Sequence, residues 1–383
     1  MDENPNKEKL LRRRLVRIVF SLISFAVLTY VAIALITGNE SGLFRVFGLF
    51  SGRGSVELAD EYYFDVGRNR VFADLEDSFA AAGTLGIQVL DADGNETLRD
   101  SFRMTSPAMT AQNGRAAAFD IGGTAVRVFN KTEVITSINT GGAIVSVSIN
   151  RNGWISVCTQ ESGVTRGTVS VYNNAGRDVY RVRMATGYVL SAVVSPDNRS
   201  VAILNLTDDG SRITFYNLSS ENVDRVFNLP GCLILDIRYL ADGDVLAIST
   251  DSLFIVDSNG KDTELYGFDS KRLGSYTLDG SIIALHLLEY SVGHNGKLLT
   301  LDEKGTLLGE IETEREIISM SSYDGYLTIL RTDGLIVFNN ALEALPISEK
   351  SVSASGAAKV LTLRNGNVLA AGDHSAVIFR IEN

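Results

Sequence analysis

Two patterns of hydrophobic positions divide this chain into one long apolar run and a region of short, alternating apolar segments. Residues 18–36 are uncharged and mostly apolar. A helix over this run, rising about 1.5 Å per residue, spans about 28 Å, close to the hydrocarbon thickness of a bilayer. This pattern predicts one transmembrane helix over residues 18–37. A cleaved signal peptide is disfavoured, because the run is long and no small-x-small cleavage site follows it.

Basic residues lie almost entirely on one side of this apolar run. The segment of residues 1–17 contains six of them: Lys7, Lys9, Arg12, Arg13, Arg14 and Arg17. Only Arg45 and Arg53 occur in the following linker, residues 38–54. The positive-inside rule therefore predicts a cytoplasmic tail over residues 1–17. We expect a single-pass plasma-membrane protein with residues 55–383 outside the cell.

The region after the linker repeats one short motif. The motif is a mostly apolar doublet, then Asp or Asn, then a polar turn. The Asp or Asn stands at seven positions: Asp91, Asn130, Asn173, Asn217, Asp257, Asp302 and Asn339. Successive copies are 39, 43, 44, 40, 45 and 37 residues apart. Several copies have glycine three residues later, which favours a hairpin turn because Asp, Asn and Gly tolerate positive φ.

A second turn, usually Asp-Gly or Asn-Gly, occurs earlier in each unit, eight times between residues 67 and 366. Runs rich in Val, Ile, Leu, Phe and Tyr lie between the turns, so each unit is predicted to hold four strands, a to d. Units of about 40–45 residues with four strands are typical of propeller blades. The sequence therefore predicts an all-β, eight-bladed β-propeller. Seven blades is the alternative if the irregular unit at residues 316–352 is not a blade.

The eighth unit has only three predicted strands, between residues 357 and 381. A strand-like segment at residues 55–59 precedes the first unit, whose strand a is predicted at residues 62–66. We expect residues 55–59 to pair with the eighth unit and close the ring. Such closure also removes an exposed sheet edge.

The repeat resembles the WD40-like and quinoprotein-like β-propeller superfamily over residues 55–383. The order of tail, span and propeller is similar to that of uncharacterised membrane-anchored propeller proteins of Gram-positive bacteria. The Trp-Asp dipeptide of WD40 blades is missing, because the single tryptophan, Trp154, is followed by Ile155. The tryptophan-docking repeat of quinoprotein blades is missing too. The resemblance therefore implies the fold and does not imply a bound quinone.

Binding residues concentrate in long loops on a rigid scaffold. Four loops between strands b and c are predicted to be long: residues 76–84, 159–167, 205–212 and 288–296. The candidate partner-binding residues on these loops are Phe79, Glu161, Arg166, Asp208, Asp209, Arg212, Tyr290 and His294. The second and third loops belong to neighbouring blades, so we expect them to share one surface.

Composition and motifs narrow the function further. The chain has a net charge of −11, and the six basic and three acidic residues of the tail leave −14 for the rest. This charge argues against nucleic-acid binding. No motif predicts a catalytic residue, a cofactor or a metal, and His286 lies within a predicted strand as a packed residue. We expect a non-catalytic binding or scaffold module of the cell envelope, with a protein or cell-wall component as partner. The alternative is a glycosidase-like extracytoplasmic hydrolase with a carboxylate pair in the propeller mouth.

Overall fold

The computed structural model describes residues 55–161, 166–220, 222–278, 282–290, 293–346, 356–364 and 367–382. Residues 56–382 form one compact unit. The predicted tail, transmembrane helix and linker lie outside the described residues. Within the described residues, no helix has the length and apolar character needed to cross a membrane.

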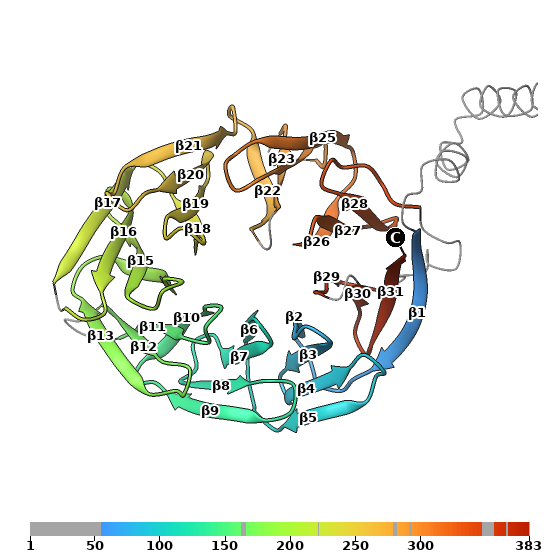
Figure 1. The fold of residues 1–383 in the computed structure, drawn as a ribbon, viewed down its shortest axis with the longest axis horizontal. Helices are drawn as coiled ribbons and strands as arrows, with labels where there is room; N and C mark the ends of the chain where they lie inside the picture. Colours follow the sequence, from blue (N-terminus) through green and yellow to red (C-terminus); the bar gives the residue numbers. More distant parts are fainter. Residues whose placement is uncertain are drawn as a thin grey trace, which may run out of the picture. The chain divides into compact units, whose positions relative to one another are not determined.

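The compact unit is a ring of eight antiparallel sheets (Figure 1). Strand a of each sheet lies nearest the centre of the ring and strand d lies at the periphery. Eight sheets confirm the predicted eight blades, and the seven-bladed alternative is wrong. The apolar cores lie within and between the blades, where side chains of neighbouring sheets pack together.

The first four blades are complete four-stranded sheets. Blade 1 contains β2 Val71–Asp74, β3 Ser78–Gly83, β4 Gly86–Asp91 and β5 Glu96–Asp100. Blade 2 contains β6 Pro107–Gln112, β7 Arg115–Asp120, β8 Ala125–Phe129 and β9 Val134–Asn139. Blade 3 contains β10 Ala143–Ile149, β11 Ile155–Gln160, β12 Gly167–Tyr172 and β13 Asp178–Met184. Blade 4 contains β14 Tyr188–Val194, β15 Ser200–Thr207, β16 Gly210–Asn217 and β17 Val223–Pro230.

The last four blades include one three-stranded sheet and one sheet built from both ends of the chain. Blade 5 contains β18 Ile234–Tyr239, β19 Val245–Ser249, β20 Ser252–Val256 and β21 Asp262–Gly267. Blade 6 contains β22 Arg272–Thr277, β23 Ile283–Leu288, β24 Gly296–Leu301 and β25 Leu307–Thr313. Blade 7 contains, in the described residues, β26 Ile317–Tyr323, β27 Tyr326–Arg331 and β28 Gly334–Asn339. Blade 8 contains β29 Lys359–Thr362, β30 Asn367–Ala371, β31 Ser375–Glu382 and β1 Ser55–Tyr63.

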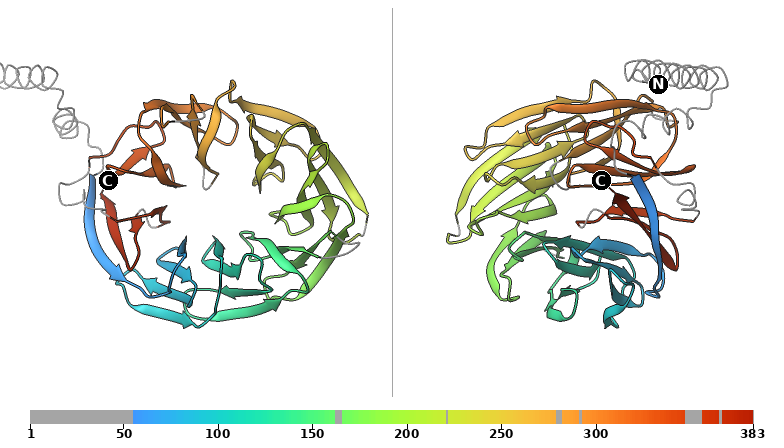
Figure 2. Two further views of the ribbon diagram at one scale, coloured as in Figure 1. Left: turned by 180° about the vertical axis from the view of Figure 1, so that it is seen from behind. Right: turned by 45° about the vertical axis from the view of Figure 1, so that its right-hand side comes forward.

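The ring closes through β1, which pairs with β31 as the outer strand of blade 8. Figure 2 shows the two strands side by side. This confirms the predicted closure. Strand a of blade 1 was predicted too early, because β1 continues to Tyr63 and the true strand a is β2. Apolar and polar residues alternate at 62–66, and this alternation is compatible with an outer strand as well as with an inner strand. Accordingly, the backbone N–H of Phe64 donates to the carbonyl of His374, 3.1 Å away, in blade 8.

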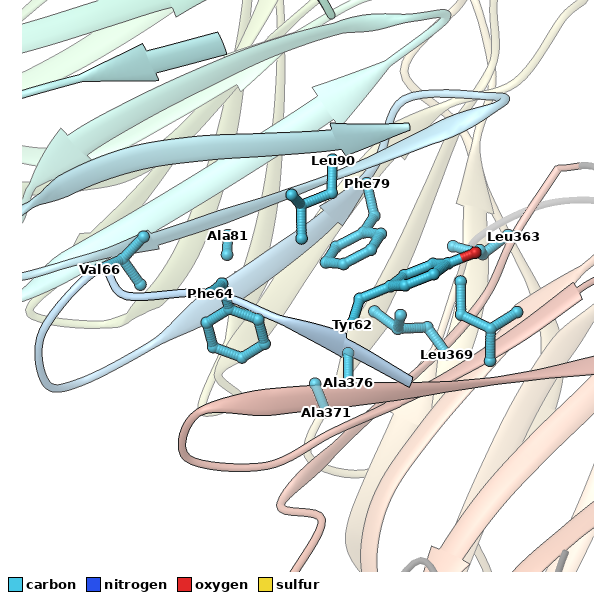
Figure 3. Packing of buried hydrophobic residues seen from close by; sticks show 11 residues of the cluster. Tyr62, Phe64, Val66, Phe79, Ala81, Leu90, Leu363, Leu369, Ala371 and Ala376 are labelled. Carbon is cyan, nitrogen blue, oxygen red and sulfur yellow. The ribbon is translucent and has the colours of Figure 1, made fainter. Parts of the chain in front are cut away.

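An apolar cluster fills the seam between blades 8 and 1 (Figure 3). Tyr62 of β1 stacks on Phe79 of β3, with ring centroids 6.0 Å apart. Leu369 from β30 and Leu90 from β4 complete the packing from both sides. Closure is therefore held by side chains as well as by strand pairing.

The repeated Asp or Asn of the sequence motif caps the turn between strands c and d. In all seven copies its side-chain Oδ1 accepts a hydrogen bond from the backbone N–H two residues later. This is an Asx turn, which satisfies backbone donors that the hairpin leaves unpaired. Where a glycine stands three residues later, as at Gly94 (80°) and Gly305 (81°), it adopts positive φ. The motif is therefore turn chemistry, which explains its recurrence.

Candidate binding face

The propeller has two faces with different loops. The loops from strand b to c and from strand d to the next strand a lie on one face, which we call the upper face. The turns from a to b and from c to d lie on the opposite, lower face. The described part of the chain exposes twelve large apolar side chains. Eight of them lie in upper-face loops or at strand ends on that face: Tyr63, Leu85, Ile121, Tyr188, Leu233, Leu235, Tyr290 and Ile318.

The other four, Val179, Val223, Val226 and Leu307, belong to the outer strands of blades 3, 4 and 6. None of the twelve lies in a lower-face turn, although Val223 and Leu307 begin their strands at the lower-face end. These eight side chains share one face but come from different blades around the ring, so they favour the upper face over the lower face for docking without forming one demonstrated patch.

β-Bulges explain how part of this apolar surface is exposed. The pairing of strands a and b skips one residue near the upper end of strand a in blades 3 to 7. In blade 5 the skipped residue is Leu235, which is 39% exposed, and in blade 7 it is Ile318, which is 44% exposed. A bulge redirects the side chain of the extra residue. These leucine and isoleucine side chains therefore leave the apolar core.

Two of the predicted long loops are wrong. Residues 78–83 form β3, so Phe79 lies inside a strand and is 1% exposed. In blade 4, β15 and β16 extend to a two-residue turn at Asp208 and Asp209, both exposed. Arg212 lies within β16, where its Nε donates to Asn228 Oδ1 at 2.8 Å. Both errors have one cause, since polar or small residues at strand ends resemble loops in sequence.

The blade 3 loop begins and ends with Glu161 and Arg166, and residues 162–165 lie outside the described residues. Glu161 Oε1 accepts a hydrogen bond from Thr168 Oγ1 at 2.7 Å. The Arg166 guanidinium donates to Tyr188 Oη at 3.1 Å and covers its ring, joining blades 3 and 4. Within the described part of the chain, no hydrogen bond or ion pair joins Glu161 or Arg166 to the Asp208–Asp209 turn.

The predicted blade 6 loop does lie between β23 and β24 on the upper face. Tyr290 there is 68% exposed, and His294 is exposed as well. Sequence reasoning missed Tyr188, Leu235 and Ile318, because each lies in a strand a that reads as buried. The signal that marks Leu235 and Ile318 is the bulge, which sequence alone does not show.

A polar cavity at the lower face contains two neighbouring carboxylates, which makes it relevant to the hydrolase alternative. Asp74, Glu76, Asn113 and Arg364 line a cavity of about 480 Å³ there. Burial raises the pKa of Asp74 to about 6, while hydrogen bonds from the backbone N–H groups of Arg364 and Glu76 oppose the rise. The Arg364 guanidinium donates to Glu76 Oε1 at 2.6 Å and to Asn113 Oδ1 at 2.8 Å. Both carboxylates therefore take part in joining blades 8, 1 and 2.

No group of three or more His, Cys, Asp or Glu side chains in the described ranges is placed to hold a metal ion. His286 is buried in β23, and its Nε2 lies 2.9 Å from Thr313 Oγ1. Burial lowers the pKa of this imidazole, and His294 lowers it further. The packed role predicted for His286 is confirmed.

Residues 55–341 match the model of a family described as a family of unknown function (DUF5711). The match includes every described strand of blades 1 to 7. The chain belongs to this family. A comparison with curated proteins finds no match.

Solved structures with the same fold are described as BamB from Moraxella catarrhalis and the C-terminal WD40 domain of Sif2. BamB has a TM-score of 0.54 and 14% identity, over 85% of this chain and 97% of BamB. The Sif2 domain has a TM-score of 0.58 and 13% identity, over 86% of this chain and 96% of the domain. At these identities the comparison shows that this DUF5711 member shares the propeller fold.

The raised pKa of Asp74 predicts a pH dependence of stability. The folded state holds this proton more tightly than the unfolded state, whose Asp has a pKa of 3.8. The stabilisation is therefore complete below pH 3.8 and is lost as the pH rises through about 6. The pKa difference corresponds to at most about 3 kcal/mol of unfolding free energy.

Asp74→Asn replaces the titrating carboxyl by a neutral amide. The melting temperature of the variant, minus that of the native protein, should therefore increase between pH 4 and pH 7.5. Hydrogen bonds altered by the substitution shift the melting temperature by the same amount at every pH, so they do not change how the difference varies with pH. If the difference in melting temperature between the two proteins stayed constant across this pH range, the pKa of Asp74 would not be raised in the folded state.

Proposed function

We propose that this protein is a single-pass plasma-membrane protein whose propeller is a non-catalytic binding or scaffold module outside the cell, in a Gram-positive-type envelope. A protein partner docks on the upper face. The observation that carries the proposal is that eight of the twelve exposed large apolar side chains of the described residues lie on that face, including Tyr188, Leu235, Tyr290 and Ile318. Aromatic and aliphatic anchors of this kind supply most of the binding energy in protein interfaces.

The chemistry of the upper face favours a protein over a glycan or a nucleic acid as its occupant. Leucine, isoleucine and tyrosine side chains recognise apolar segments, and the net charge of −11 opposes a polyanion. The fold supports this proposal too, since a ring of eight rigid sheets holds the loops of all blades on one surface. The engagement of Asp74 and Glu76 with Arg364 favours a structural role for these carboxylates over a hydrolytic one.

The proposed location is supported by the sequence alone. The apolar run at residues 18–36 has the length of a bilayer span, and the basic residues precede it. Together they favour a cytoplasmic N-terminus and an external propeller.

The two native cysteines provide a test of this orientation. Cys158 is buried, and burial raises the pKa of its thiol to about 12, so it is unreactive at neutral pH. Cys232 is partly exposed in the upper-face loop between β17 and β18. A membrane-impermeant maleimide added to wall-free, intact cells should label Cys232, and Cys232→Ser should abolish the label.

A partner bound to the upper face would shield Cys232 from the maleimide, so a second thiol on the lower face is tested as well. In the Cys232→Ser background, Ser258→Cys places a thiol in the exposed turn between β20 and β21. This variant should also be labelled from outside. Labelling of either position only after lysis would overturn the proposed orientation.

A further inference from the structure

The upper-face loop between blades 4 and 5 presents two leucines to solvent. Leu233 is 36% exposed and Leu235 is 39% exposed, whereas Ile234 between them is buried in the apolar core that the two blades share. Side chains alternate along an extended segment, so the two leucines lie on the side opposite to Ile234. They therefore form one exposed apolar element within a single loop.

Hydrogen bonds from both neighbouring turns hold this loop in place. On one side, the Ser211 N–H donates to the Cys232 carbonyl at 3.1 Å, and Ser211 Oγ accepts from the Ile234 N–H at 2.8 Å. On the other side, the Thr250 N–H donates to the Leu233 carbonyl at 3.0 Å. A loop that is already fixed loses little conformational freedom when a partner binds, which favours its use as a docking element.

The same two turns carry carboxylates. Asp208 and Asp209 form the turn between β15 and β16, and the Gly231 N–H donates to the Asp209 carbonyl at 2.7 Å. Asp251 lies in the turn between β19 and β20, and its Oδ2 accepts a hydrogen bond from the Cys232 thiol at 3.2 Å. All three aspartates are exposed, and none makes an ion pair with any described residue.

The segments joined by these hydrogen bonds are acidic. Residues 208–211, 231–235 and 250–251 contain three aspartates and no lysine or arginine. Arg212 follows the blade 4 turn, and its Nε is bonded to a side chain of β17. The basic residues 271–272 belong to the next upper-face loop, where the chain enters blade 6. Exposed carboxylates without a cationic partner attract basic groups, so the surroundings of the leucines complement positive charge.

We propose that the loop at residues 231–235 docks a partner segment in which an aliphatic or aromatic anchor is flanked by lysine or arginine. The anchor packs on Leu233 and Leu235, and the flanking cations pair with the three aspartates of the two turns. This inference rests on the proposed function, because it names the part of the upper face and the chemistry of the partner. The apolar contact supplies affinity, whereas the charges orient the partner and exclude acidic segments.

Two sets of substitutions separate the apolar contact from the charges. The first set, Leu233→Ser with Leu235→Ser, removes the anchor surface. The second set removes three charges and keeps the side-chain shapes: Asp208→Asn, Asp209→Asn and Asp251→Asn. All five side chains are exposed, so the melting temperature of each variant should stay nearly unchanged.

A matched control removes the same charge from the opposite face. Asp93, Asp262 and Asp324 are exposed and lie in turns or at a strand end on the lower face. Their joint replacement by asparagine changes the net charge of the chain by the same amount as the second set. Any effect of net charge alone is therefore common to both variants.

The probe is a library of random peptides displayed on phage. It is selected on the full-length protein in nanodiscs of a zwitterionic lipid, and peptides that bind empty nanodiscs are removed. Enriched peptides should share an aliphatic or aromatic residue flanked by lysine or arginine.

The enriched peptides are then synthesised and titrated by fluorescence anisotropy. The leucine substitutions should weaken their binding at least about tenfold, and the aspartate substitutions about threefold to tenfold. The lower-face control should bind like the native protein. Raising NaCl from about 0.05 M to about 0.5 M should weaken binding to the native protein more than to the Asp→Asn variant, because salt screens exposed charges.

Three results would overturn the inference: no peptide enriched over empty nanodiscs, enriched peptides without basic residues, and binding that neither set of substitutions weakens. These results would leave the proposed function standing, because crosslinking in native membranes tests it separately. Conversely, the absence of any crosslinked protein partner in native membranes would contradict the proposed function even where basic peptides bind the loop.

Discussion

Removing residues 1–60 is expected to unfold or aggregate the propeller, whereas removing residues 1–53 should leave it folded. The first truncation deletes most of β1 Ser55–Tyr63, the outer strand of blade 8. Strand β31 then exposes its backbone groups along most of one edge, which is a template for aggregation. The chain that begins at Gly54 keeps β1 and serves as the control.

The expected size of this effect follows from the seam. Tyr62 packs against Phe79 and the apolar residues of blades 8 and 1, and it loses its support when the strand before it is missing. We expect a melting temperature lower by roughly 10 °C or more, with soluble aggregates in size-exclusion chromatography. Equal melting temperatures for the two truncated chains would show that β1 does not stabilise the ring.

The double substitution Leu235→Asp and Ile318→Asp should abolish recovery of the native partner. Both side chains are exposed on the upper face at β-bulges, so their replacement should cost the fold little. Burying two carboxylates in an apolar interface, by contrast, carries a desolvation cost of several kcal/mol, which removes binding. Partner recovery is measured by crosslinking in native membranes, followed by affinity purification.

The matched control is Val223→Asp with Val226→Asp. These valines are 48% and 43% exposed on the outer strand β17, and the pair adds the same charge to the chain. This variant should recover the partner like the native protein. If both double variants behaved alike, the partner would not depend on the upper face.

The fold could be read from the sequence because its information is local and repeated. The turn signals between strands c and d, such as Asp302 with Gly305, have the same structural role in blades 1 to 7. The closure by β1 was also predictable, because a ring with one missing strand needs another. The exact start of blade 1 was not predictable. The alternation of apolar and polar residues around Tyr62 continues from the outer strand β1 of blade 8 toward blade 1, so it does not mark where one blade ends.

The candidate site was predicted less well, because its features depend on register and on contacts between blades. Phe79 and Arg212 were placed in loops, although both lie in strands. The exposure of Leu235 depends on a one-residue skip in pairing with β19, which composition does not encode.

The most direct test of the central claim compares crosslinking from the two faces of one blade. A heterobifunctional crosslinker is attached either to Cys232 on the upper face or, in the Cys232→Ser background, to the thiol of the Ser258→Cys variant on the lower face. A partner on the upper face predicts one protein adduct from Cys232, its loss in the Leu235→Asp and Ile318→Asp variant, and no adduct from position 258. The same adduct from position 258, or an undiminished adduct in the double variant, would contradict docking on the upper face.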